Sequence, residues 1–308
     1  HTIDILREAA IDPSVTAISI NLYRIAQNSK IINALINASK NGKDVTVIVE
    51  LRARFDEEYN IECSRRLQEN GVKVISGVEG LKVHAKLVLI TRKVGLKKVD
   101  IAHIGTGNFH EGNARIYTDH SLWTADTRIT HEVAKLFEFF RHNFKPGIYR
   151  ELIVSPFNTR RRITELIDVE IKNAKEGKPA YMVIKLNNLV DEELVRKLYK
   201  ASQAGVKIQM LIRGICSLMA GIPGLSENIE IRSVLDRYLE HSRVMIFANG
   251  GNERIFIGSA DWMGRNLDMR IEVITPIYDT EIKKNIRKII NIQLNYKKYE
   301  CNKKSNIR

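Results

Sequence analysis

The sequence lacks the features of a disulfide-bonded or membrane-spanning protein. Its 308 residues include only three cysteines, Cys63, Cys216 and Cys301, which form no Cys-x-x-Cys pair and no disulfide framework. It has no recognisable signal peptide and no run of about 18 apolar residues. These absences favour a cytoplasmic location, in a reducing compartment, and they leave membrane association as an open alternative.

Acidic residues are also scarce relative to basic ones. Lys and Arg total 49 against 36 for Asp and Glu, which leaves a formal net charge of +13. This excess predicts a polyanionic partner, and charge alone does not choose among a nucleotide, polyphosphate, nucleic acid and an anionic membrane. A hydrophobic fraction of 44% is sufficient for an ordinary core, and the length favours two domains.

The most informative feature is a short signature that occurs twice, 157 residues apart. His84-Ala85-Lys86 and His241-Ser242-Arg243 each place a cation two residues after a histidine and lead into an apolar run. A small-residue turn follows each copy, at Gly105 and at Gly258, with an offset of 153 residues. The chain therefore contains two copies of one domain, which is too few for a solenoid.

Alternating strand and helix patterns are predicted in both halves. In the first half we expect strands at 15–22, 45–51, 72–75, 84–90 and 100–105, with helices at 31–40 and 57–70. In the second half we expect strands at 180–186, 206–212, 229–233, 241–247 and 254–258, with a helix at 192–203. This order predicts two tandem α/β domains related by a pseudo-two-fold axis, at 1–152 and 153–300, with a tail at 301–308.

The paired histidines suit the chemistry of phosphorus. In a strand, residues i and i+2 point to the same side, so each histidine is expected to share a face with its cation. An imidazole can attack phosphorus while cations hold the phosphate oxygens. A single such histidine would more often be a core residue, but the repeated spacing favours a catalytic role for His84. His241 is either a second catalytic group or a vestige of the duplication, and we favour a working role.

Arginines follow several of the expected strands. Arg24 follows the first strand, Arg52 and Arg54 follow the second, and Arg213 follows the corresponding strand of the second half. Ligands of open α/β sheets lie at the carboxyl ends of the strands, where arginines bind phosphate oxygens bidentately. The alternative is that these are surface arginines near helix ends. Tyr117, by its local sequence alone, is more typical of a packed strand residue.

The repeated pattern resembles the phospholipase D superfamily, whose signature HxK(x)4D with a downstream GSxN occurs twice. Thr91 and Ala248 stand where the aspartate of that signature belongs. The resemblance therefore implies two tandem phospholipase D-like domains, but it does not extend to the acid of phosphodiester hydrolysis.

Longer segments resemble a particular family. AISINLYR, VTVIVELRARFDEE, GLKVHAKLVLI, HIGTGNFHEGNARIYTD, LIRGIC and EHSRVMIF are similar to the two C-terminal catalytic domains of the polyphosphate kinase family. The resemblance covers residue 1 to about residue 295 and implies ATP:polyphosphate phosphotransfer. It also implies that the two preceding domains of that family are absent, and that the longer protein forms a homo-oligomer.

The resemblance implies a role for individual residues. His84 matches the phosphohistidine nucleophile, and His241 matches a second essential histidine near ATP. Tyr117 and Arg213 match positions that contact the nucleotide. Further phosphate or nucleotide contacts are expected at Lys86, Arg243, Asn108 and Asn113.

Mg²⁺ is the implied cofactor. Arg24 and Arg54 match positions that the family assigns to its magnesium site. Mg²⁺ prefers oxygen ligands and retains water molecules, so we expect these arginines to contact phosphates that carry the ion. The implied partners are ATP or ADP and inorganic polyphosphate, with no nucleic acid.

Two other functions remain open from the residues alone. One is a phospholipase D-like phosphodiesterase or nuclease, which the residues Thr91 and Ala248 disfavour. The other is an inactive module that binds polyanions, which the intact histidines His84 and His241 disfavour. Polyphosphate chain length, the favoured direction of reaction and the oligomeric state do not follow from the sequence.

Overall fold

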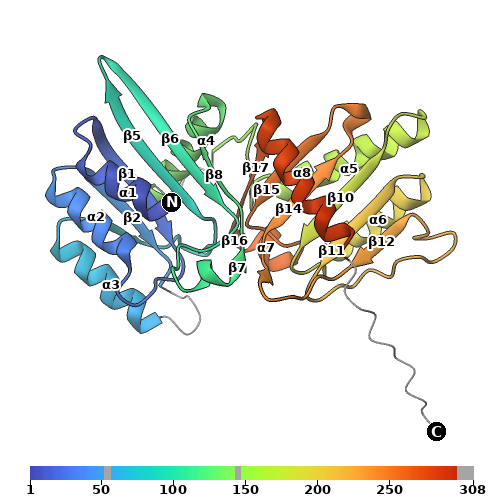
Figure 1. The fold of residues 1–308 in the computed structure, drawn as a ribbon, viewed down its shortest axis with the longest axis horizontal. Helices are drawn as coiled ribbons and strands as arrows, with labels where there is room; N and C mark the ends of the chain where they lie inside the picture. Colours follow the sequence, from blue (N-terminus) through green and yellow to red (C-terminus); the bar gives the residue numbers. More distant parts are fainter. Residues whose placement is uncertain (52–56, 143–146, 297–308) are drawn as a thin grey trace, which may run out of the picture.

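Two mixed β-sheets, one from each half of the chain, lie side by side (Figure 1). The structure is a computed structural model that describes residues 1–51, 57–142 and 147–296. The expected tail at 301–308 lies outside the described residues. Among the helices of the described part, none is long and apolar enough to cross a membrane.

The first sheet has the strand order β3-β2-β1-β5-β6-β8. Its strands are β1 (Val15–Leu22), β2 (Asp44–Val49), β3 (Lys73–Ser76), β5 (Leu87–Val94), β6 (Lys97–Gly105) and β8 (Ser121–Thr124). The first three are parallel, because helices α2 (Lys30–Lys40) and α3 (Glu57–Glu69) carry the chain back between them. The remaining strands are antiparallel.

The second sheet repeats this plan, with the order β12-β11-β10-β14-β15-β17-β9. Its strands are β9 (Ile153–Val154), β10 (Tyr181–Leu186), β11 (Lys207–Ile212), β12 (Ile229–Arg232), β14 (Arg243–Phe247), β15 (Arg254–Gly258) and β17 (Val273–Ile277). Strand β10 lies between a parallel and an antiparallel neighbour, as β1 does in the first half. The two halves thus share one strand topology, as the repeat in the sequence predicts.

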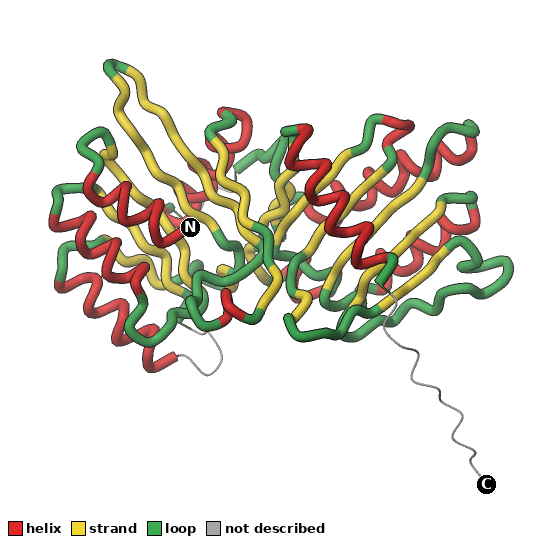
Figure 2. Tube along the Cα trace, viewed as in Figure 1, coloured by secondary structure: helices red, strands yellow, loops and turns green. Residues whose placement is uncertain are grey.

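Helices cover both faces of each sheet (Figure 2). The first sheet packs against α1 (Thr2–Ile11), α2 and α3 on one face and α4 (Thr127–Arg141) on the other. The second packs against α5 (Thr159–Lys175) and α6 (Glu192–Gln203) on one face and α8 (Thr280–Leu294) on the other. Asp126, Asp191 and Asp279 accept backbone N–H bonds at the starts of α4, α6 and α8.

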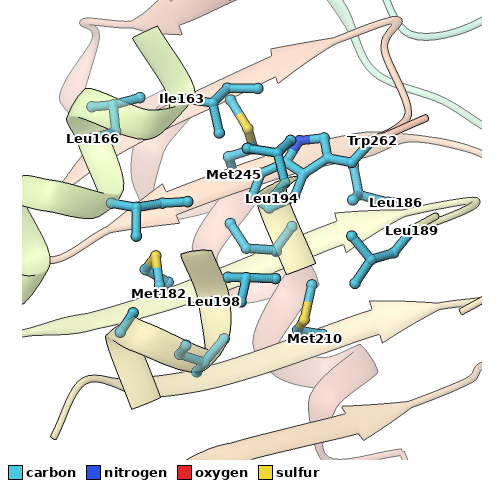
Figure 3. Close-up of a cluster of buried hydrophobic side chains, with 14 of the residues drawn as sticks. Ile163, Leu166, Met182, Leu186, Leu189, Leu194, Leu198, Met210, Met245 and Trp262 are labelled. Carbon is cyan, nitrogen blue, oxygen red and sulfur yellow. The ribbon is translucent and has the colours of Figure 1, made fainter. Parts of the chain in front are cut away.

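Apolar side chains fill the layers between helices and sheets. In the second half, Met182 and Met210 of the sheet belong to one buried cluster with Leu194 and Leu198 of α6 and the fully buried Trp262 (Figure 3). Another cluster joins the halves, since Phe137 of α4 belongs to the same buried group as Ile271 and Val273. The two halves therefore share a core, which holds one against the other.

The strands expected at 84–90 and 241–247 begin later than the sequence predicts. Pairing stops after β4 (Lys82–Val83) and resumes at β5, and it stops after β13 (Leu239–Glu240) and resumes at β14. The expectation that each histidine begins a strand is therefore wrong, although Arg243 still lies beside the His241 ring. The physical reason is that both short strands leave their own sheet to pair with the opposite half.

Candidate active site

Two short parallel ribbons cross between the halves of the molecule. Strand β4 pairs with β16 (Arg270–Ile271), and β13 pairs with β7 (Tyr117–Thr118). The Ile271 carbonyl accepts the N–H groups of His84 and Ala85, at 2.9 and 2.8 Å. In the same way, the Thr118 carbonyl accepts those of His241 and Ser242, at 3.3 and 3.0 Å. Each histidine is therefore placed opposite the residue that follows a ribbon of the other half, which is an acid in both cases.

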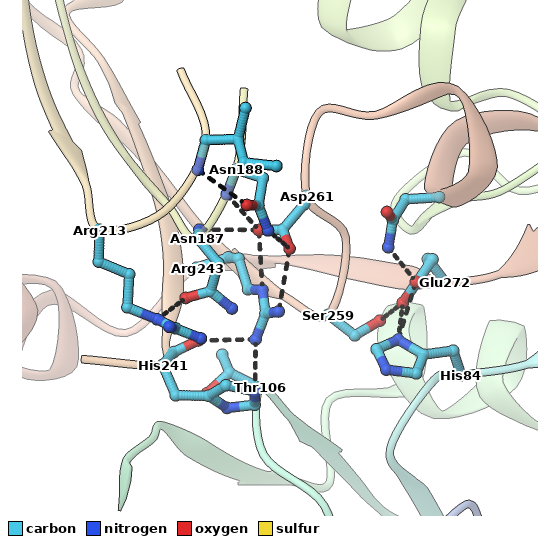
Figure 4. A network of polar contacts seen from close by, with 12 residues as sticks. His84, Thr106, Asn187, Asn188, Arg213, His241, Arg243, Ser259, Asp261 and Glu272 are labelled. Carbon is cyan, nitrogen blue, oxygen red and sulfur yellow. Dashed lines mark hydrogen bonds and ion pairs between the residues drawn. The ribbon is translucent and has the colours of Figure 1, made fainter. Parts of the chain in front are cut away.

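Glu272 of the second half holds His84 of the first (Figure 4). The His84 Nδ1 lies 2.8 and 2.9 Å from the two carboxylate oxygens. Ser259 Oγ and Asn266 Nδ2 donate to the same carboxylate, which is completely buried. Although burial raises the pKa of Glu272, the neighbouring His84 and Lys86 and these hydrogen bonds lower it to about 2. The ionised carboxylate makes Nδ1 the donor, so Nε2 carries the lone pair.

The environment of His84 keeps its ring neutral. Burial is the main cause that lowers the His84 pKa to about 4, and the positive charges of Lys86 and Arg270 act in the same direction against Glu272. The Tyr23 ring meets the imidazole edge-on, with centroids 4.9 Å apart. Within the described residues, the His84 Nε2 has no hydrogen bond. A neutral imidazole with an unengaged lone pair can act as a nucleophile.

Asp119 of the first half holds His241 of the second by the reciprocal arrangement. The His241 Nδ1 lies 2.9 and 3.0 Å from the Asp119 oxygens, and Thr106 Oγ1 donates to Asp119 at 2.6 Å. The Tyr117 ring packs against His241, with centroids 5.0 Å apart. Unlike His84, this histidine has its second nitrogen engaged, because Arg243 Nη1 lies 3.2 Å from Nε2. The pseudo-symmetric pair is thus chemically unequal.

Cations from both halves surround the two histidines. Arg243 is held by Asp261, at 3.3 and 3.2 Å, and Arg213 donates from Nε to Asn187 Oδ1 at 2.7 Å. Lys86 is 2% exposed, and its Nζ donates to the His84 carbonyl. The charges of Glu272 and Arg243, from across the junction, affect the Lys86 pKa. The two halves therefore form one electrostatic site.

The remaining predicted phosphate or nucleotide contacts are Asn108, Asn113, Arg24 and Arg54. Asn108 lies in the turn after β6, and its buried Oδ1 has no partner among the described residues. Asn113 opens a short 3₁₀ helix, and its backbone N–H donates to His110 Nδ1 at 3.2 Å. Arg24 is half-buried just beyond β1, whereas Arg54 lies outside the described residues. Their roles in phosphate binding stay predictions.

Two acids that the sequence patterns did not single out orient the histidines. Asp119 and Glu272 are separated by 153 residues, the same offset that relates Gly105 to Gly258. The hydroxyls that hold them, Thr106 and Ser259, repeat at this offset too. The repeated offset was therefore an available signal, but nothing in it indicated that each acid would pair with the histidine of the opposite half.

The ionisation of Lys86 yields a testable pH dependence. Burial lowers the pKa of Lys86 to about 7, with Arg243 adding to the shift and Glu272 opposing it. Lys86 is charged below that pH and His84 is neutral above about 4, so kcat/KM for an anionic substrate that reacts at His84 should be flat from pH 5 to 6.5 and fall above 7.

Lys86→Arg provides the matched test of this profile, since arginine keeps its charge and already occupies the equivalent position at Arg243. The falling limb should disappear in this variant when initial rates are measured from pH 5 to 9. A falling limb unchanged in Lys86→Arg would exclude Lys86 as its origin.

Family models match the two halves of the chain in order. The model described as polyphosphate kinase C-terminal domain 1 matches residues 1–146, and the model of C-terminal domain 2 matches residues 152–307. Curated polyphosphate kinases of Vibrio vulnificus (strain YJ016) and Escherichia coli (strain K12) are 56% and 53% identical over 293 and 292 residues. Both alignments cover 95% of this chain and 42% of the relative, so the chain spans about two fifths of the relatives' length.

Solved structures agree with this assignment. The crystal structure of polyphosphate kinase from Porphyromonas gingivalis matches with a TM-score of 0.88 and 44% identity, over 96% of this chain and 45% of that one. A phosphatidylserine synthase from Haemophilus influenzae matches with a TM-score of 0.65 and 10% identity, over 96% and 85%, which supports the fold alone.

The fold and site define a class of duplicated α/β proteins in which each half supplies one histidine to a shared, cation-rich site. The predicted fold class of two tandem phospholipase D-like domains is confirmed. Within this class, the chain belongs to the polyphosphate kinase C-terminal domain family. The exact domain boundary at 152 and 153 stays a prediction.

Proposed function

We propose that this chain carries the catalytic site for reversible transfer of the ATP γ-phosphate to inorganic polyphosphate, through a phosphohistidine at His84. The observation that carries the proposal is the inequality of the two histidines. The Nε2 of His84 is unengaged within the described residues, whereas that of His241 lies 3.2 Å from the Arg243 guanidinium. Family membership and the cluster of cations support the same reaction.

In the first step, the His84 Nε2 lone pair attacks the γ-phosphorus. An Nε2–P bond forms as the bond from the γ-phosphorus to the bridging oxygen breaks, and ADP leaves with that electron pair. Positive charge develops on the imidazole, and the Glu272 carboxylate at Nδ1 stabilises it. In the second step, a terminal oxygen of polyphosphate attacks the phosphorus, and the electrons of the Nε2–P bond return to His84.

In this proposal, the negative charge of the transferred phosphoryl group is stabilised by Arg243, Lys86 and Arg213. Their guanidinium and ammonium groups face phosphate oxygens that gain charge as the bridging bond breaks. His241 lies beside Arg243 and is held by Asp119, so we assign it to the leaving or entering oxygen rather than to phosphorus. We assign the nucleotide to that side, because the Tyr117 ring packs on His241 and offers a surface for a base.

Mg²⁺ would enter this site with the phosphates rather than as an ion held by the protein. Within the described residues, no three His, Cys, Asp or Glu side chains group to hold a metal ion. The two central acids, Asp119 and Glu272, are already engaged by the histidines. The described residues thus do not fit a resident magnesium site. Arg24 is assigned to phosphate contact.

Phosphodiester hydrolysis fits the described residues less well. Thr91 donates to Asp100 Oδ1 at 2.6 Å within the β5–β6 hairpin, and Ala248 is 1% exposed. Neither position offers an acid to the histidines.

We also propose a cytoplasmic location and a homo-oligomer of the longer protein. We propose no nucleic acid partner.

Incubation with ATP labelled at the γ-phosphate tests the proposed function. The protein should acquire label that is labile in acid and stable in base, and polyphosphate should discharge that label into polymer. Hydrolysis of a phosphodiester without phosphoprotein would instead favour the phospholipase D-like activity. Binding of polyphosphate without labelled protein or turnover would favour the inactive module.

A further inference from the structure

A cavity of about 830 Å³ lies at the junction of the two halves, within the size range of ligand sites. Its wall comprises the end of β2, the loop that leads from β3 into β4, and α7 (Gly264–Asp268) with β16. Figure 1 places α7 and β16 at this junction. The cavity is therefore built by both halves, like the paired histidines.

Three cations line this cavity: Lys82, Arg265 and Arg270. Lys82 and Arg270 are directly paired across the β4–β16 ribbon. No ion pair of Arg265 or Arg270 occurs among the described residues, so neither guanidinium is neutralised by a carboxylate there. Of the lining acids, Glu50 is 5% exposed and directs its Oε2 to the Val83 N–H at 2.9 Å. Glu79, the other lining acid, is exposed, and the positive charge of the wall rests on Arg265 and Arg270.

This cationic wall leads to the proposed nucleophile. His84 comes directly after β4, two residues from Lys82, and Glu272 comes directly after β16, two residues from Arg270. The charge of Arg270 also contributes to lowering the His84 pKa. A ligand that lies along Lys82 and Arg270 would therefore reach the imidazole.

The residues that line the cavity favour a phosphate chain over a nucleoside as its ligand. None of the described residues that line the cavity is aromatic. On the other side of the site, the Tyr117 ring packs beside His241 and offers a surface for a base. An unbranched polyanion needs cations along its length and no stacking surface.

In-line transfer requires donor and acceptor to present their terminal phosphates at the same place, opposite Nε2. The rest of each substrate needs different contacts, because a nucleotide needs a surface for its base whereas a phosphate chain needs cations along its length. We propose that the cavity beside β4 and α7 holds the internal phosphates of the polyphosphate acceptor, with Lys82 and Arg265 as direct contacts. This inference rests on the proposed function and adds a subsite to it.

Single-turnover measurements on Arg265→Gln and Lys82→Gln test the subsite. Each variant is charged with ATP and then discharged to ADP, tripolyphosphate or long-chain polyphosphate. Arg196→Gln is the matched control, because Arg196 is an exposed arginine of α6 paired with Glu192. Loss of one charged contact should raise the half-saturating concentration of long-chain polyphosphate about tenfold. Formation of phosphohistidine and discharge to ADP should change less than about twofold.

An equal rise for ADP would assign these cations to the nucleotide and overturn the inference, as would an unchanged value for long-chain polyphosphate. Titration of long-chain polyphosphate in the absence of ATP separates the subsite from the proposed function. If the wild-type protein forms no phosphohistidine, the proposed function fails, but weaker binding by Arg265→Gln than by Arg196→Gln still sustains the subsite. Equal binding by these two variants overturns it.

Discussion

Replacement of His84 by alanine is expected to abolish the labelled phosphoprotein and to reduce phosphotransfer by on the order of 10⁴-fold or more. His84 has a neutral ring, a carboxylate on Nδ1 and no hydrogen bond at Nε2 within the described residues. No other nucleophile in the described site combines these features. The measurement is the amount of acid-labile label per protein after incubation with γ-labelled ATP.

His241→Ala is the matched control for this experiment, because His241 is the pseudo-symmetric partner with a comparable exposure of 12% against 13%. Label should persist in this variant, at a reduced rate, while turnover falls. Label that survives in His84→Ala and disappears in His241→Ala would reverse the assignment of the two histidines.

Glu272→Gln is expected to slow phosphohistidine formation by about 10² to 10⁴-fold, although the amide has nearly the same shape. Glutamine does not supply the negative charge that stabilises the imidazolium, and its amide can donate to Nδ1 and so favour the other tautomer. Since Glu272 raises the His84 pKa against the effect of burial, its loss should lower that pKa further below about 4. The readout is the labelling rate with its pH profile.

Asp119→Asn makes the equivalent change on the opposite side and controls for general damage to the site. It should leave the labelling rate within about tenfold of wild type, since it orients the histidine that does not attack phosphorus. Both variants should keep the unfolding midpoint near that of wild type. Equal loss of labelling in both would show that the acids act as one unit rather than each on its own histidine.

The sequence by itself determined the local elements and the type of chemistry. Strand β1, helix α6 and strand β15 have the bounds expected from the sequence, because continuous apolar runs and glycine turns are local signals. The repeated histidine and cation predicted that each half contributes one histidine to a single site, and the structure holds each histidine by an acid of the other half. The topological duplication followed from the constant offset of the small-residue turns.

The tertiary structure decided how these parts combine. The break between β4 and β5 was not predictable, because Lys82 and Val83 pair with residues 188 positions away in the sequence. The pairing of His84 with Glu272, and of His241 with Asp119, follows from these crossed ribbons. Local patterns carry no information about which half an acid will face. The histidines are unequal because Arg243 lies against the His241 Nε2, whereas Lys86, at the equivalent position, donates to the His84 carbonyl and leaves the His84 Nε2 without a hydrogen bond among the described residues.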